Sequence, residues 1–154
     1  MTGNLGRRLI LAFNITQEIF NEVPLPEIAT SEIKYVSLLG KCLCITVSCN
    51  GTNKFDVWVM KEYGYRYSWC KLFTFVGEWC FNSPLMSLKP LCYSSDRSKV
   101  LLEVKFRGDF KSDPKKKLFW YYLKSYKVTY VPRIPNFIET MIYAGILLPP
   151  SLPS

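Results

Sequence analysis

Hydrophobic and polar residues alternate with a period of two along most of the chain, in short runs separated by turn residues such as Asn50-Gly51 and Tyr63-Gly64. This period is typical of half-buried β-strands, whereas a sustained helical period is almost absent. The pattern predicts an all-β protein. The expected strands cover residues 9–15, 19–23, 33–39, 42–47, 55–60, 69–75, 100–106, 118–123 and 127–131.

A pair of strands recurs three times in the sequence. The first strands of the pairs cover residues 10–15, 55–60 and 118–123, and the second strands cover 19–23, 69–75 and 127–131. Strand-rich repeats of about 40 to 50 residues are typical of propeller blades, which are four-stranded sheets that must pack on their neighbours. We therefore expect antiparallel sheets arranged as two to three propeller-like, kelch-like blades, which form a partial propeller.

The length of 154 residues favours one domain, and the content of 49% hydrophobic and 16% aromatic residues favours pleated, half-buried strands. We expect this domain to cover residues 1–148 and to be followed by an extended Pro/Ser-rich tail over 149–154. The apolar run near the start is too short for a signal peptide or a membrane span. We therefore predict a cytoplasmic or nuclear protein that does not interact with membranes.

Six cysteines stand at positions 42, 44, 49, 70, 80 and 92. In a chain that is not exported they are expected to be reduced thiols. A zinc site would need Cys-x-x-Cys pairs or histidines, and this chain has neither, so we expect no metal and no cofactor. Alternation over residues 42–47 puts Cys42 and Cys44 on one face and Ile45 and Val47 on the other, and both faces are apolar enough to be buried. Trp58 and Trp69 are likewise expected in the core.

The whole excess of positive charge comes from one part of the chain. Between Arg97 and Arg133, 11 lysines and arginines stand against three acidic residues, which accounts for the net charge of +8. Gly, Pro and charged residues over 107–117 predict an exposed hairpin loop. Lysines 115 to 117 precede four aromatic residues, a combination that could also bind single-stranded nucleic acid. Alternation would turn half of these aromatic side chains into the core.

Catalysis has little support in the sequence. The chain contains no histidine, which excludes a Ser-His-Asp triad, a Cys-His pair and a histidine-bound catalytic metal. The 12 acidic residues are scattered, and no pair stands out as the two carboxylates of a glycosidase. We therefore expect a binding module and not an enzyme.

One stretch of the sequence stands out, Phe55-Asp56-Val57-Trp58-Val59-Met60-Lys61-Glu62-Tyr63-Gly64, followed by Ser68-Trp69-Cys70-Lys71-Leu72-Phe73. It resembles the most recognisable part of the F-box associated interaction domain of plant F-box proteins. Shorter matches occur in the family's order at 10–20, at 40–44, at 90–93 and at 100–102, and Val23-Pro24-Leu25-Pro26 also fits. The resemblance covers about residues 9–134.

The resemblance implies a kelch-like β domain that captures the protein substrate of a cullin-based ubiquitin ligase, in which a separate F-box docks on the ligase adaptor. Because no Leu-Pro-rich F-box precedes the match, we do not expect this chain to bind the adaptor by itself. A protein interface needs exposed aromatic and Arg anchors, often on loops. Tyr63, Tyr65, Arg66 and Tyr67 are the candidates. The alternative function is a basic β module that binds single-stranded nucleic acid.

Overall fold

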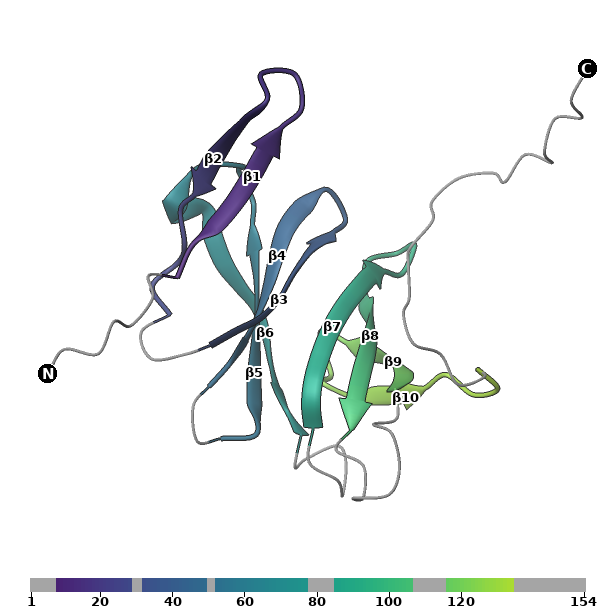
Figure 1. Ribbon diagram of the computed structural model, residues 1–154. Coiled ribbons are helices and arrows are strands. Elements are labelled where there is room, and N and C mark those ends of the chain that lie inside the picture. Colours follow the sequence, from purple (N-terminus) through teal and green to yellow (C-terminus); the bar gives the residue numbers. More distant parts are fainter. Residues whose placement is uncertain (1–7, 29–31, 50–51, 78–84, 107–115, 135–154) are drawn as a thin grey trace, which may run out of the picture.

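The computed structural model describes residues 8–28, 32–49, 52–77, 85–106 and 116–134. These segments form three antiparallel sheets (Figure 1). No helix in these segments is long and apolar enough to cross a membrane. The strands are β1 Ile10–Asn14, β2 Ile19–Val23, β3 Glu32–Leu39, β4 Cys42–Ser48, β5 Lys54–Met60, β6 Trp69–Val76, β7 Leu85–Tyr93, β8 Lys99–Phe106, β9 Lys116–Tyr122 and β10 Val128–Tyr130, with a 3₁₀ turn, η1, at Arg66–Ser68.

Each sheet is a meander of strands that follow one another in sequence. The central sheet has the order β3-β4-β5-β6, the second four-stranded sheet has the order β7-β8-β9-β10, and β1 pairs with β2 in a hairpin. This all-β architecture of open antiparallel sheets confirms the predicted fold class and is compatible with a partial propeller. The recurring strand pairs are β1–β2, β5–β6 and β9–β10, and the last two pairs are the third and fourth strands of their sheets.

The central sheet packs against a layer on each face, although Val36 and Leu38 of its edge strand β3 remain 47% and 65% exposed. One face packs against the sheet β7–β10 around residues such as Val57, Phe75 and Leu102. The other face packs against the hairpin around Val23, Ile45 and other side chains of β4 to β6. Figure 1 shows this order, with the central sheet between the hairpin and the second four-stranded sheet. The prediction that both faces of residues 42–47 are apolar enough to be buried is confirmed.

The first strands of the two large sheets lie side by side. Tyr35 Oη of β3 donates a hydrogen bond to Ser87 Oγ of β7 at 3.3 Å. Further along the interface, Phe73 stacks on Tyr121 with ring centroids 4.4 Å apart. Trp58 and Trp69 lie on neighbouring strands as expected and share the apolar cluster beneath the hairpin, although Trp58 stands opposite Lys71 in the register.

Two sequence expectations differ from the structure. Strand β7 was not predicted, because Pro90 cannot donate a ladder hydrogen bond and interrupts the expected strand pattern. The structure places Pro90 on the edge strand of its sheet, at a register shift between Pro90 and Cys92. The predicted loop over 107–117 is also too long, since Lys116 and Lys117 already belong to β9. Residues 107–115 and the tail 149–154 lie outside the described residues.

The interface between the two large sheets should dominate the stability of the fold. Phe75 is 1% exposed and packs near Tyr121, so Phe75→Ala removes a large buried ring and leaves a cavity. We expect the free energy of unfolding to fall by about 3–5 kcal/mol in equilibrium urea denaturation. The control Tyr67→Ala, at an exposed position, should change it by less than about 0.5 kcal/mol. Equal effects of the two substitutions would contradict this assignment of the core.

The turn between β7 and β8 carries a pH-dependent contact. The side-chain hydroxyl of Ser94 donates to Asp96 Oδ1 at 2.7 Å, and the backbone N–H and side-chain hydroxyl of Ser98 donate to the same oxygen at 3.1 and 2.8 Å. These hydrogen bonds favour the carboxylate and lower the pKa of Asp96 from 3.8 to about 2.

A lowered pKa in the folded state means that this contribution to stability is present above pH 3.8 and is lost as the pH falls towards 2. Asp96→Asn removes the titrating group. We therefore expect the variant to lose less stability than the wild type between pH 4 and pH 2, measured by urea denaturation at each pH. Parallel pH profiles for the two proteins would show that Asp96 does not contribute.

Candidate protein-binding site

The four residues predicted to bind protein lie together in the connection from β5 to β6. Tyr63 and Tyr65 follow the end of β5, and Arg66 and Tyr67 belong to η1. The tyrosine side chains are 68%, 52% and 83% exposed in chain order. The rings of Tyr65 and Tyr67 meet edge to face with centroids 5.7 Å apart, so two of the three aromatic side chains form one unit.

A set of short hydrogen bonds fixes the backbone under these side chains. Lys61 N donates to Ser68 O at 3.1 Å, and Tyr65 N donates to Glu62 O at 3.1 Å. Ser68 Oγ lies 2.7 Å from the carbonyl oxygens of both Glu62 and Tyr65. The bond between Lys61 and Ser68 closes the two ends of the loop, and the other bonds join residues inside it.

Gly64 makes the turn possible at the tip of the loop. Its φ of 84° lies in the left-handed region, which side chains disfavour. Its backbone N–H donates to the sulfur of Met60, a core residue, at 3.2 Å. The tip is thus tied to the buried end of β5, and the exposed tyrosines stand on a fixed backbone.

A second segment, residues 24–27, lies beside this loop. Pro24 O accepts a hydrogen bond from Trp69 Nε1 at 2.7 Å, which fastens the segment to the start of β6. Arg66 Nη2 lies 3.7 Å from Glu27 Oε1, an ion pair so exposed that it contributes less than about 1 kcal/mol. The guanidinium therefore stays accessible to a ligand.

A shallow hollow of about 340 Å³ opens between the two segments. Its lining comes from three parts of the chain, namely Arg8, Glu22, Pro24, Leu25, Pro26 and Arg66. Sequence analysis assigned only Arg66 to the site. The run Pro24-Leu25-Pro26 belongs to the stretch that resembles the family. Its position beside Arg66 depends on the hydrogen bond from Trp69 to Pro24, which joins residues 45 positions apart and has no local sequence signal. The candidate site therefore combines exposed aromatic rings with a neighbouring hollow that is lined by two arginines, Glu22 and the segment 24–26.

The basic and aromatic residues of the alternative function lie on the far sheet. Phe119 and Tyr121 point into the core, as alternation predicts. On the opposite face, Lys99 Nζ lies over the rings of Trp120 and Tyr122, at 4.7 and 5.4 Å from their centroids. Lys116 Nζ lies 3.1 Å from a carboxylate oxygen of the buried Glu103. These cations are already engaged with rings and a carboxylate of the same sheet.

The cysteines show no sign of a shared site. Cys42, Cys44, Cys70 and Cys92 are free thiols, and Cys49 Sγ donates a hydrogen bond to Asp56 Oδ2 at 3.6 Å. Cys80 lies outside the described residues. Burial raises the pKa of the Cys44 thiol to about 12, so this group is protonated and unreactive at neutral pH. Among the described residues there is no group of three Cys, Asp or Glu side chains that could hold a metal ion.

These features define a class of protein, a β module of stacked antiparallel sheets with a fixed aromatic loop at one end. Its relatives are plant F-box proteins. The chain is 35% identical over 132 residues to the F-box protein CPR1 of Arabidopsis thaliana, an alignment that covers 82% of this chain and 29% of that protein. It is 30% identical over 159 residues to a second A. thaliana F-box protein (91% of this chain, 36% of the relative) and 36% identical over 97 residues to an F-box/kelch-repeat protein (61% and 24%).

The chain is thus a relative of plant F-box proteins over most of its length, and the resemblance to their F-box associated domain is confirmed. It spans between about a quarter and a third of the length of these relatives. No protein-family profile and no solved structure matches the chain.

The hydroxyl of Ser68 should control the order of the aromatic loop. Ser68→Ala removes its hydrogen bonds to Glu62 O and Tyr65 O without altering the core. We expect a loss of about 1 kcal/mol in stability and faster hydrogen exchange of the Tyr65 amide. Exchange of amides in β8 should not change. An unaltered exchange rate at Tyr65 would mean that the other backbone contacts suffice.

Proposed function

We propose that this chain recognises a protein substrate of a cullin-based ubiquitin ligase, as the substrate-binding part of an F-box protein. The proposal is carried by one observation: in a relative of F-box proteins, a rigid loop exposes Tyr63, Tyr65 and Tyr67 around Arg66. Tyr and Arg are the side chains that most often dominate binding energy at protein interfaces. The role is non-catalytic, in the cytoplasm or nucleus, and contact with the ligase adaptor belongs to an F-box.

Recognition by this site follows from the rigidity of its parts. Side chains that are ordered before binding lose less conformational entropy when a partner docks. The loop hydrogen bonds hold the tyrosines, and the bond from Trp69 holds Pro24 beside them. A partner that inserts an apolar side chain against residues 24–26 and an acidic group against Arg66 fits this chemistry.

Single substitutions in the loop should separate recognition from folding. We expect Tyr65→Ala and Arg66→Ala each to weaken binding of a captured partner by about 1–2 kcal/mol, or roughly 5- to 30-fold. The experiment is quantitative affinity capture from plant extract with the wild type and each variant, followed by calorimetry with the purified partner. The matched control is Tyr126→Ala, which removes an exposed tyrosine next to the other large sheet.

A true substrate should also be ubiquitinated when the chain is fused to an F-box, and this modification should fall in the two loop variants. If all variants retain the same partners with the same affinity as the wild type, the loop is not the recognition site. If the captured partner binds normally but is not modified by the fused ligase, the chain is a binding module outside this pathway.

A further inference from the structure

Four connections between neighbouring strands of the two large sheets concentrate positive charge. They cover residues 40–41, 61–68, 94–98 and 123–127. They contain six basic residues and two acidic residues, namely Lys41, Lys61, Arg66, Arg97, Lys124 and Lys127 with Glu62 and Asp96. All eight are exposed. We call these four connections the basic rim.

The rim is continuous from one large sheet to the other. In an antiparallel sheet of the order β3-β4-β5-β6, the β3–β4 turn and the β5–β6 connection leave the same end of the strands. The β3–β4 turn also lies against the second sheet, since a Cβ atom on Gly40 would be 3.5 Å from the ring of Tyr93 at the end of β7. In that sheet, Leu123 N donates a hydrogen bond to Ser98 O at 3.0 Å, which joins the β9–β10 turn to the β7–β8 turn.

Local contacts hold the charges of the second sheet in place. Arg97 Cζ lies over the ring of Tyr93, 5.1 Å from its centroid. The ring carries no net charge, so this contact orders the guanidinium without neutralising it. Tyr122 N donates to Lys127 O at 2.9 Å and closes the turn that carries Lys124. The backbone under these cations is therefore fixed.

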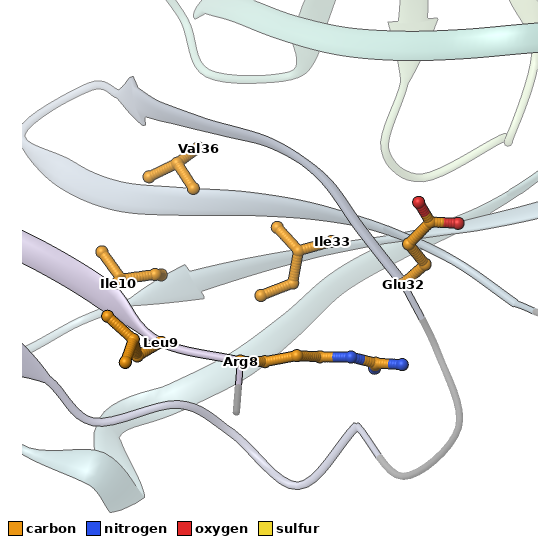
Figure 2. Close-up of a pocket in the computed structure, with 6 residues that line it drawn as sticks. All are labelled: Arg8, Leu9, Ile10, Glu32, Ile33 and Val36. Carbon is orange, nitrogen blue, oxygen red and sulfur yellow. The ribbon is translucent and has the colours of Figure 1, made fainter. Parts of the chain in front are cut away.

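A hollow between β1 and β3 has a different chemistry. Figure 2 shows the residues that line this space of about 390 Å³, which are Arg8, Leu9, Ile10, Glu32, Ile33 and Val36. Four of them are apolar, and the other two carry one charge of each sign. The charges in this hollow cancel, whereas the excess of one sign on the rim can select a partner by its charge.

We propose that the basic rim binds an acidic segment of the captured protein, one in which Asp or Glu residues alternate with uncharged residues. This inference rests on the proposed function and extends its recognition surface from the aromatic loop across the other three connections. Charge complementarity of this kind speeds the encounter of two proteins and orients them. Carboxylates of the segment would pair with Arg66 and Arg97 through charge-assisted hydrogen bonds.

Two carboxylates within the rim favour a polypeptide over a nucleic acid. Glu62 stands beside the cations of the aromatic loop, and Asp96 accepts hydrogen bonds from the hydroxyls of Ser94 and Ser98 in the β7–β8 turn. A nucleic acid carries a negative charge at every phosphate and would be repelled at these two positions. A polypeptide can place an uncharged or basic residue opposite each carboxylate.

The test is a binding titration of the full chain with a fluorescent peptide of alternating Glu and Ser, about 12 residues long, which spans about 40 Å when extended. We expect saturable binding of this peptide and none of the matched peptide of alternating Gln and Ser. Lys41→Glu and Lys124→Glu each reverse one charge of the rim outside the aromatic loop. Each should weaken binding about fivefold at about 0.1 M salt, where the Debye length is about 10 Å.

Two control variants separate the position of a charge from its amount. Lys54→Glu makes the same change of charge at the exposed start of β5, at the opposite end of the central sheet, and should weaken binding by less than about twofold. Tyr126→Ala lies in the same turn as Lys124 but keeps the charge of the rim, and it should bind the peptide like the wild type.

Three results would overturn the proposal. They are the absence of binding to the Glu–Ser peptide, equal losses in Lys54→Glu and Lys124→Glu, and a single-stranded oligothymidine of equal charge that binds more tightly and is weakened by the same variants. The last result would identify nucleic acid as the occupant.

The protein captured from plant extract distinguishes this inference from the proposed function. It should bind more weakly to Lys41→Glu and Lys124→Glu as well as to the loop variants. If only Tyr65→Ala and Arg66→Ala lose it, recognition is confined to the loop, and the inference fails while the proposed function stands. If the rim variants behave as expected but the fused ligase modifies no captured protein, the proposed function fails while the rim remains a site for acidic segments.

Discussion

Burial of the middle of the central sheet on both faces is the constraint on which the rest of the structure depends. In β4, Cys44 faces one neighbouring layer and Ile45 faces the other, and both are inaccessible to solvent. A sheet with two apolar faces cannot be stable alone in water, because roughly 25 cal/mol of free energy is lost for each Å² of apolar surface left exposed. It requires a layer on each side, and the hairpin and the second large sheet supply them. The stack of layers therefore follows from the composition of the central strands.

The same constraint explains where polar and exposed aromatic residues can stand. The interiors of β4 and β5 have little room for them, so they gather at strand ends and in the connections. The connection from β5 to β6 starts at the buried Met60 and ends at the buried Trp69, and both ends hold it in place. Trp69 has two roles, since its ring fills the core under the hairpin while its Nε1 fastens Pro24 beside the aromatic loop. The candidate site is rigid because it is attached directly to the core.

Alternation in the sequence was enough to predict nine of the ten strands that the structure describes, and the recurring pairs correspond to real hairpins. It failed where another rule competes with it, at Pro90 in β7, because an edge position removes the cost of the missing hydrogen bond. In the candidate site, the local cluster from Tyr63 to Tyr67 was predictable because its members are neighbours in the chain. The contribution of Pro24, Leu25 and Arg8 was not, since it depends on how the hairpin lies across the sheet, a tertiary contact without a local sequence signal.

The two ends of the stack meet solvent in different ways. On the outer face of the sheet β7–β10, lysine stems and cations cover the rings, with Lys99 over Trp120, and the buried Glu103 is neutralised by Lys116. Lys99 and Lys116, two of the basic residues in this part of the chain, thus help to make an aromatic sheet face compatible with water. A phosphate group would have to compete with the rings of Trp120 and Tyr122 for the ammonium group of Lys99. In the hairpin at the other end, Leu11, Phe13 and Phe20 are exposed, and no lysine of the described residues lies over the two rings. The charged face is built for solvent, whereas the apolar hairpin is suited to contact with more protein.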